Sequence, residues 1–398
     1  MFIPKLRFIV MSDIHIDPPK DCVELARLRQ AFDFAYNYAD NSDYKKIDAF
    51  VTVGDFASSG AREEMLNFKE VLDEKLRDET QVILSMASHE YRANGEDGAK
   101  ALFKEIFDMP YDVHKVVNGF HFISVSSTRG CNFDEPQKEF ARKSLEQAAA
   151  DSPDAPIFFF QHPHISGTVY GSINWGEDAL YPILMNYPQV IDFSGHSHSP
   201  INDPRSIHQK HFTSLGTGSL SYFELDEFDK WYGTIPPNDE QCAQFLIVET
   251  DSGNRVRVYP VDVLTGNFFH EPWKIDCPSE PSTFMYTDKR YNTSVKPHFS
   301  DDVFAQVSEN DEGVVITFPQ AQISEDRVND YKVVVRNENG KIVRQICAWS
   351  GYYFYNMPET ISVPVKGLEK GKYTAEITAK GFWNNESDNS VKTSFEIR

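Results

Sequence analysis

Apolar runs of strand length alternate with segments of helical period over residues 6 to about 262. The runs are RFIVM, AFVTV, VILSM, FHFISVS, IFFFQ, VIDFS, HFTSL, FLIVE and RVRVYPV. Near-continuous hydrophobicity is typical of strands that are covered on both faces, and alternation with helices is typical of a layered α/β domain. The pattern therefore predicts sheets that are flanked by helices.

Helical periodicity is clearest from Val23 to Tyr38. Apolar residues recur there on one face of a helix, at Leu25, Leu28, Phe32 and Ala35. A weaker pattern of the same kind occurs in segments 62–77, 98–108, 135–150 and 176–186. We expect these segments to form the helices that cover the sheets.

The pattern changes after residue 265. Prolines are frequent and periodicity is absent in residues 266–300, which predicts a linker or a wrapping segment. Residues 301–398 contain short alternating strands separated by turn signals, which predicts a small all-β sandwich. The run GLEKGKYTAEITA resembles the fibronectin type III pattern of the immunoglobulin-like sandwiches, in which a tyrosine, here Tyr373, lies near the start of a late strand.

The composition excludes several kinds of protein. Sixty acidic residues against 39 basic ones give a formal charge of −21, which argues against binding to nucleic acid or to an anionic membrane. No apolar stretch approaches the roughly 18 residues of a membrane span, and the amino terminus reads as a strand and not as a signal peptide. We therefore expect a cytoplasmic protein, and the oligomeric state stays open. Five scattered cysteines indicate neither a disulfide framework nor a zinc ribbon.

Five of the apolar strands end in clusters of Asp, His or small polar residues. These clusters are Asp13-Ile14-His15, Gly54-Asp55, Ser88-His89-Glu90, His162 and Gly195-His196-Ser197-His198. Residues i and i+2 of a strand point to the same side, so the outer residues of the first and last clusters can each present two ligands to one place. The carboxyl ends of strands in an α/β sheet meet at a crevice. The sequence therefore predicts a metal site there.

In order and type, these motifs resemble the calcineurin-like metallophosphoesterase superfamily, whose motifs are D-x-H, G-D, G-N-H-D/E, H and G-H-x-H. The resemblance spans residues 6 to about 262. It implies an α/β fold of four layers, a β-sandwich of two sheets flanked by helices, with a two-metal site along one edge. We accordingly divide the chain into a metallophosphoesterase domain at 1–265, a linker or wrapping segment at 266–300 and a fibronectin III-like β-sandwich at 301–398.

The resemblance also implies roles for individual residues. The first metal would be held by Asp13, His15, Asp55 and His198. The second would be held by Asp55, His162 and His196, so that Asp55 bridges both.

Two further positions matter for the chemistry. His89 corresponds to the family histidine that hydrogen-bonds the phosphate or assists the leaving group, and is not itself a ligand. Ser88 stands where the family has an asparagine that binds the second metal, and Ala87 stands where glycine is usual. A serine hydroxyl is shorter and a poorer ligand than an amide oxygen. We therefore expect a weaker second site.

The implied activity is hydrolysis of a small phosphodiester, cyclic nucleotide or phosphomonoester by a hydroxide that two metal ions activate. Mixed nitrogen and carboxylate ligands favour Mn, Fe or Zn. One alternative is a catalytically weakened metal-binding scaffold or sensor, whose carboxyl-terminal sandwich recruits a partner. A nuclease is disfavoured by the acidic charge. Weaker candidates for substrate contacts are His164, Arg92, Arg205, Tyr91 and Tyr170.

Overall fold

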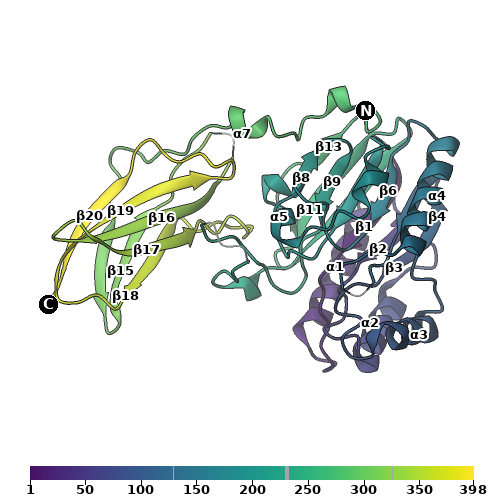
Figure 1. Ribbon diagram of the computed structural model, residues 1–398, viewed down its shortest axis with the longest axis horizontal. Helices are drawn as coiled ribbons and strands as arrows, with labels where there is room; N and C mark the ends of the chain where they lie inside the picture. Colours follow the sequence, from purple (N-terminus) through teal and green to yellow (C-terminus); the bar gives the residue numbers. More distant parts are fainter. Residues whose placement is uncertain (129, 229–232, 325) are drawn as a thin grey trace. The chain divides into compact units, whose positions relative to one another are not determined.

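The computed structural model describes residues 1–128, 130–228, 233–324 and 326–398. The chain divides into two compact units, Met1–Thr287 and Asp288–Arg398 (Figure 1). The described part of the first unit contains helices and two sheets, whereas that of the second contains strands and the short helix α7 (Arg290–Thr293).

Two sheets form the centre of the first unit. One has the strand order β12-β11-β10-β1-β2-β3, with β13 also paired to β11. Its strands are β1 (Pro4–Met11), β2 (Ala49–Val53), β3 (Gln81–Ser85), β10 (Gln244–Asp251), β11 (Val256–Asp262), β12 (Asn267–Phe268) and β13 (Trp273–Ile275). The other has the order β4-β5-β6-β7-β9-β8. Its strands are β4 (Val113–Val117), β5 (Phe120–Ser124), β6 (Ile157–Phe160), β7 (Val190–Ser194), β8 (Ile207–Gln209) and β9 (Thr213–Gly216).

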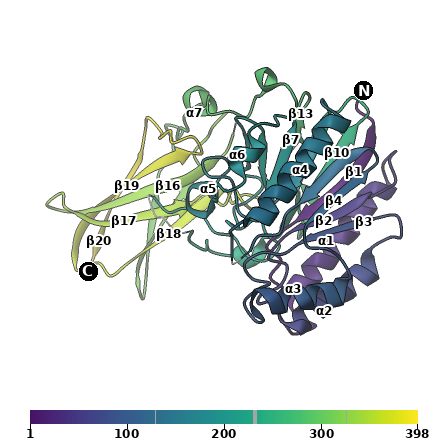
Figure 2. The same cartoon turned by 45° about the vertical axis from the view of Figure 1, so that its right-hand side comes forward.

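Helices cover the outer faces of both sheets. Those of the first sheet are α1 (Val23–Asp40), α2 (Arg62–Lys75) and α3 (Gly95–Phe107). Those of the second are α4 (Glu135–Asp151) and α6 (Tyr181–Leu184), with the single turn α5 (Ser172–Trp175) nearby in the chain. Figure 2 shows α4 along one side of the strands and α2 and α3 along another. Three short 3₁₀ turns are η1 (Pro204–Ser206), η2 (Asp239–Gln241) and η3 (Pro281–Thr283).

The alternation of side chains along β1 shows how the layers are held together. Phe8 and Val10 point into the core between the two sheets, whereas Ile9 and Met11 pack against the helices. The ring of Phe8 lies 4.9 Å from that of Phe122 in the other sheet. Burial on both faces explains why these strands are hydrophobic almost throughout. The predicted four-layer fold of two sheets between helices is confirmed.

Segment 176–186, which was expected to be one helix, is helical only from Tyr181 to Leu184. Its beginning is tied to another loop, because Gly176 forms a β-bridge with His164 and the Glu177 N–H donates to the His164 carbonyl at 2.8 Å. Backbone groups that bond to a distant loop cannot also bond within a helix. A tertiary contact therefore overrides the helical pattern.

Segment 266–300, which was expected to be a linker or a wrapping segment, contributes strands to the first unit. β12 and β13 both pair with β11, and Trp273 and Ile275 join the core between the sheets. The strands are two and three residues long, too short for a period to be visible in the sequence. The boundary between the two compact units falls in the chain between Thr287 and Asp288.

The second unit consists of a three-stranded and a four-stranded sheet, in the orders β14-β15-β18 and β17-β16-β19-β20. The strands are β14 (Gln306–Asn310), β15 (Gly313–Pro319), β16 (Val328–Asn337), β17 (Ile342–Trp349), β18 (Thr360–Lys366), β19 (Gly371–Gly381) and β20 (Val391–Ile397). Tyr373 lies near the start of β19, and its hydroxyl donates to the carbonyl of Glu369 at 2.8 Å. The carboxyl-terminal unit is thus all β apart from α7 in its described residues, and its fibronectin identity stays a prediction.

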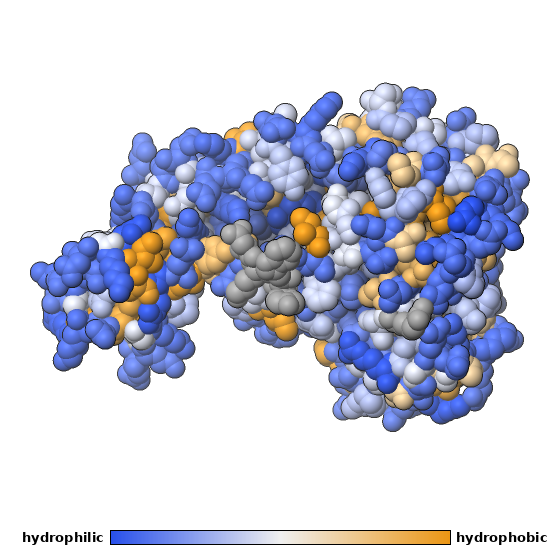
Figure 3. Space-filling view, viewed as in Figure 1, coloured by the Kyte–Doolittle hydropathy of each residue, from blue (hydrophilic) through white to orange (hydrophobic). Residues whose placement is uncertain are grey.

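The surface and the cysteines agree with the composition. Hydrophilic side chains predominate on the face that Figure 3 shows. None of the helices in the described ranges combines the length and the apolarity that a bilayer span requires. No disulfide joins any two of the cysteines in the described ranges.

One buried carboxyl group in β7 makes the stability of the first unit depend on pH. Asp192 is fully buried and accepts a hydrogen bond from Gln161 Nε2 at 2.9 Å. Burial raises the pKa of Asp192 to about 8. The folded protein therefore keeps the proton in neutral solution, whereas the unfolded chain releases it above roughly pH 4. Protonated Asp192 therefore contributes its full stabilisation of the folded state below the pKa of the unfolded chain, roughly 4. This stabilisation is lost as the pH rises to about 8, the pKa in the folded protein.

We predict that Asp192→Asn, which is neutral at every pH, removes this loss. The free energy of unfolding of the variant relative to the wild type should increase between roughly pH 4 and 8 and be constant at higher pH. Urea unfolding at pH 5, 7 and 9 measures this difference. The exposed Asp154→Asn is the control and should show no such trend. A pH-independent difference for Asp192→Asn would contradict the prediction.

Candidate metal centre

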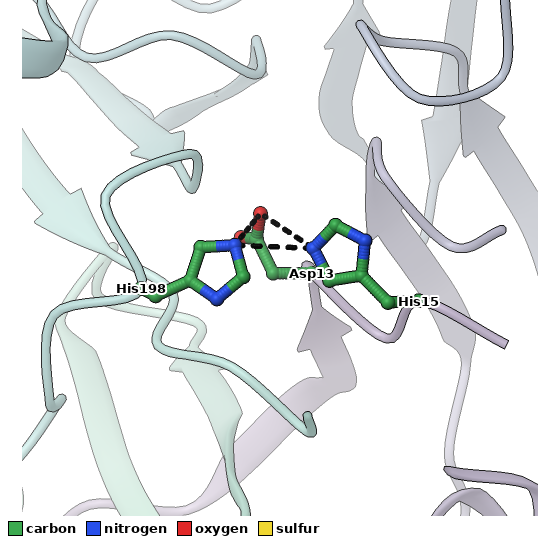
Figure 4. Close-up of side chains that lie close together, drawn as sticks. All are labelled: Asp13, His15 and His198. Atoms are coloured by element: carbon green, nitrogen blue, oxygen red, sulfur yellow. Dashed lines mark hydrogen bonds and ion pairs between the residues drawn. The ribbon is translucent and has the colours of Figure 1, made fainter. Parts of the chain in front are cut away.

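The polar clusters predicted from the sequence converge beyond the carboxyl ends of their strands. Asp13 and His15 follow β1, and Asp55 follows β2. The other strands contribute histidines in the same way: His89 after β3, His162 after β6, and His196 and His198 after β7. Figure 4 shows the imidazoles of His15 and His198 directed toward the Asp13 carboxylate from opposite sides.

Potential metal ligands gather into three overlapping groups in the described residues. In each group the ligand atoms lie within 4.8 Å of one another. The groups are Asp13, His15 and His198; His15, Asp55 and His89; and Asp55, His162 and His196. Every Asp and His that the sequence singled out as a ligand belongs to at least one group.

The backbone at these residues differs from the extended strand that the sequence predicted. β1 ends at Met11 and β7 ends at Ser194. Beyond the strands, the ligand residues adopt left-handed conformations with φ between 50° and 71°, namely Asp13, His15, Asp55, His196 and His198. Such conformations cost about 1–3 kcal/mol each in residues other than glycine and concentrate at functional sites. Asp13 and His15 share a ligand group because of these turns and not because of the strand pleat, whereas His196 and His198, which were expected to meet at one place, belong to different groups.

Backbone hydrogen bonds and two glycines hold the ligand loops together. The N–H groups of Ile14 and His15 both donate to the carbonyl of Asp55, at 2.9 and 3.1 Å. A Cβ atom on Gly54 would lie 2.5 Å from the Cβ of Ala87, and one on Gly195 would lie 2.4 Å from Asp13 Oδ2. Only glycine allows these close approaches. This explains the glycine that precedes a ligand in both motifs.

Two histidines present the same ring nitrogen to the centre. Nδ1 of His162 lies 2.7 Å from the Val53 carbonyl, and Nδ1 of His198 lies 3.0 Å from the Tyr222 carbonyl. Each Nδ1–H therefore donates to the backbone, which leaves Nε2 free to face the carboxylates. His162 Nε2 lies 3.0 Å from Asp55 Oδ2.

Two atoms of the centre are buried without a hydrogen-bond partner among the described residues. They are Asp13 Oδ1 and His162 Nε2. Leaving a buried polar atom unpaired costs free energy. A carboxylate oxygen and an imidazole nitrogen are both ordinary ligands of transition metals, so the residues of this centre fit metal ions.

The charges at the centre are strongly coupled. Burial favours neutral Asp13 and Asp55, but nearby histidines, chiefly His198 and His162 respectively, outweigh burial and lower the pKa of each acid. Burial likewise opposes protonation of His162, yet the charges of Asp55 and Asp13 raise its pKa to about 10. Burial and the charge of His198 lower the pKa of His15 to about 3. The buried negative charge thus requires a positive counterpart.

Glu90 links two loops of the centre by accepting hydrogen bonds from their backbone N–H groups. This fully buried carboxyl group accepts backbone N–H groups of Asp55 and Ala57, both at 3.0 Å, and of Ala87 at 2.8 Å. Burial and the nearby Asp55 charge raise the pKa of Glu90 to about 8. Glu90 therefore positions the backbone of Asp55, and it belongs to none of the three ligand groups.

Ser88 and His89 both contact the Asp55 carboxylate. The Ser88 hydroxyl donates to Asp55 Oδ2 at 3.1 Å, and the His89 N–H donates to Asp55 Oδ1 at 2.9 Å. The His89 imidazole, whose Nδ1 lies 2.8 Å from the Ser58 carbonyl, keeps 16% of its surface exposed. His89 is thus more accessible than the buried ligand candidates.

Sequence reasoning missed three side chains at the centre. The ring of Tyr222 lies 4.1 Å from that of His198, and the ring of Trp175 lies 5.0 Å from that of His196. Cys131 Sγ lies 3.2 Å from His196 Nε2. Tyr222 and Cys131 lie in loops and Trp175 ends the single-turn helix α5, and none of the three belongs to a motif, so no local signal marks them.

The weaker candidates from the sequence have structural roles in most cases. His164 is buried with both ring nitrogens engaged, by Ser194 and Ser197 at 2.7 Å each, which supports a structural role. Tyr91 is also buried and donates to the Ser127 carbonyl. Arg205 pairs with Asp203 and stacks on Tyr170, with its guanidinium carbon 3.9 Å from the ring centroid. Arg92 is exposed.

Comparison with known proteins agrees with this geometry. Residues 6–200 match the family model described as calcineurin-like phosphoesterase. The matched segment contains every ligand candidate of the centre. No curated protein matches the chain.

Solved structures resemble the chain only distantly. Purple acid phosphatase PPD1 of yellow lupin (Lupinus luteus) is 14% identical with a TM-score of 0.47, over 69% of this chain and 55% of the lupin chain. Vps29 of Chaetomium thermophilum is 9% identical with a TM-score of 0.29, over 68% of this chain and 95% of its own. The chain therefore spans only about half of the lupin protein.

We predict that Mn²⁺ or Zn²⁺ raises the Tm of the first unit. At about 100 times Kd, one bound ion stabilises the folded state by about 2.7 kcal/mol, because it pairs with the buried carboxylates. Differential scanning calorimetry with and without metal measures the shift. Asp55→Ala should lose most of it, and Asp154→Asn should keep it. An equal shift in wild type and Asp55→Ala would place the bound ion elsewhere.

Proposed function

We propose that this protein is a metal-dependent phosphoesterase that hydrolyses a small phosphodiester, cyclic nucleotide or phosphomonoester. The observation that carries the proposal is the convergence of three His and Asp groups on two buried carboxylates. The calcineurin-like domain match supports the same class of chemistry.

The residues would hold two ions. Asp13, His15, His198 and Asp55 form the first set, and Asp55, His162 and His196 form the second, with Asp55 shared. The mixed oxygen and nitrogen donors suit Mn, Fe or Zn. When bound, such ions lower the pKa of a coordinated water and neutralise charge on phosphoryl oxygens.

His89 would act on the substrate. Its Nδ1–H faces the Ser58 carbonyl at 2.8 Å, so Nε2 can donate a proton only when the ring is an imidazolium. Burial lowers the pKa of His89. A bound phosphate carries negative charge and favours the imidazolium. His89 would then donate from Nε2 to a phosphoryl oxygen or to the leaving oxygen.

We predict that His89→Ala lowers kcat by about 10²–10⁴-fold and leaves the metal content unchanged. Hydrolysis of bis-p-nitrophenyl phosphate and p-nitrophenyl phosphate, with elemental analysis of the same samples, measures both quantities. His270→Ala is the matched control, because His270 belongs to none of the three groups. Parallel losses of metal and activity would instead make His89 a ligand.

Ser88 determines how firmly the second ion is held. Its hydroxyl donates to Asp55 at 3.1 Å and so supports that carboxylate. The resemblance places an asparagine here, whose longer side chain would bring a carbonyl oxygen to the second ion. The wild-type second site should therefore be the weaker of the two.

We predict that Ser88→Asn tightens binding of the second ion and raises kcat, because it supplies the missing ligand. Metal titration followed by calorimetry and the two phosphate assays measure the change. Ser88→Ala, which removes the hydrogen bond to Asp55 and adds no ligand, should show no gain. Unchanged affinity in Ser88→Asn would mean that residue 88 does not reach the second ion.

The serine at position 88, where the family has an asparagine, also supports a second candidate function. A metal-loaded protein without turnover on a broad panel of phosphoesters, which Ser88→Asn does not rescue, would favour a metal-binding scaffold or sensor. In that case the carboxyl-terminal sandwich would recruit a partner.

A further inference from the structure

The histidines of the centre differ in which ring nitrogen is held. His162, His198 and His89 each place Nδ1 against a backbone carbonyl, at 2.7, 3.0 and 2.8 Å. His196 is different, because its Nε2 contacts Cys131 Sγ at 3.2 Å. In His196 the nitrogen with a protein partner is therefore Nε2 instead of Nδ1, and the partner is a cysteine sulfur instead of a backbone carbonyl oxygen.

A ligating imidazole must be neutral, with one nitrogen for the metal and a proton on the other. If Nε2 of His196 carries the proton toward Cys131, Nδ1 is the nitrogen that remains for a ligand. A cysteine sulfur is a weak acceptor, and 3.2 Å suits an N–H···S contact. The contact is compatible with two arrangements, a Cys131 S–H that donates to Nε2 or an Nε2–H that donates to Sγ, and only the second leaves Nδ1 for a metal ion.

A separate observation indicates that a ligand belongs beside His196. His162 Nε2 is fully buried and has no hydrogen-bond partner in the described part of the chain. His162 and His196 share a ligand group with Asp55, and their rings lie 5.0 Å apart. His162 Nε2, which makes no hydrogen bond but lies 3.0 Å from Asp55 Oδ2, therefore belongs to the same ligand group as His196.

Cys131 lies in a loop that is closed on itself. The N–H of Thr128 donates to the Asn132 carbonyl at 2.7 Å, and the N–H of Asn132 donates back to the Thr128 carbonyl at 3.0 Å. The Trp175 ring also contacts the His196 ring, edge-on at 5.0 Å. His196 is thus restrained by both Cys131 and Trp175.

We propose that Cys131 is a positioning residue of the second metal site, which accepts the His196 Nε2–H and so presents Nδ1 to the ion. This inference rests on the proposed function, because it requires an ion held by Asp55, His162 and His196. Outer partners of ligating histidines typically contribute 10–100-fold to metal affinity. Orientation of His196 matters more here because Ser88 is a poor ligand.

The first test compares Cys131→Ala and Cys131→Ser by titration with Zn²⁺ against a competing chelator. We expect Cys131→Ala to bind the second ion about 10–100-fold more weakly and the first ion as in wild type. Cys131→Ser should keep most of the affinity, because its oxygen can accept the same proton. Cys277→Ala, at another half-buried free thiol of the first unit, is the matched control.

The second test reads the tautomer directly in the wild-type protein loaded with Zn²⁺. Long-range ¹H–¹⁵N spectra of histidine-labelled protein, assigned with His196→Gln, should show a metal-bound Nδ1 and a protonated Nε2 at His196. A metal-bound Nε2 would overturn the proposal. This measurement needs no cysteine variant, so it decides the question even if Cys131→Ala does not fold.

Other outcomes separate this inference from the proposed function. Equal affinity of Cys131→Ala and wild type for both ions would overturn the role of Cys131 alone. A thiolate-to-cobalt charge-transfer band in Co²⁺-loaded wild type, absent from Cys131→Ser, would make Cys131 a ligand and also overturn its positioning role. A wild-type protein that binds no second ion would overturn the two-metal site and, with it, the basis of both proposals.

Discussion

The first unit depends on the placement of two carboxylates, Asp13 and Asp55, in a buried site. Ionised groups are costly to bury unless they are paired and hydrogen-bonded. The protein provides the pairing through histidines from four different strands and through backbone N–H groups, including that of His196 to Asp13 Oδ2 at 3.1 Å. Asp13 Oδ1 and His162 Nε2 nevertheless make no hydrogen bond among the described residues, and only ion pairs contact them. Bound metal ions would balance the remaining negative charge of the two buried carboxylates.

Two packed sheets make this placement possible. Asp13 and Asp55 follow neighbouring strands of one sheet, whereas His162 and His196 follow strands of the other. The aromatic core around Phe8 fixes the sheets against each other. Because the strands are rigid, the left-handed turns at their ends can be strained without becoming mobile. The fold therefore supplies the rigidity, and the loops supply the chemistry.

Much of this arrangement was predictable from the sequence. Burial on both faces makes a strand hydrophobic throughout, which is visible without a structure, and the helix beginning at Val23 has a clear apolar stripe. The ligand candidates were predictable because each follows such a strand within a short motif. Strands of two or three residues, such as β12 and β13, were not predictable, because a period needs several residues to be visible.

The residues that the sequence could not identify act through contacts between distant segments. Cys131 lies 65 positions from His196, and its neighbours in the chain carry no signal of metal chemistry. His164 shows the opposite case, since it lies in a motif region but two serines satisfy both of its nitrogens. The sequence alone determined the layered fold and the identities of the ligand candidates, because both depend on local patterns of hydrophobicity and residue type. Only the tertiary structure decided which nitrogen each histidine presents and which groups remain unpaired, because hydrogen bonding depends on the spatial neighbours of each atom.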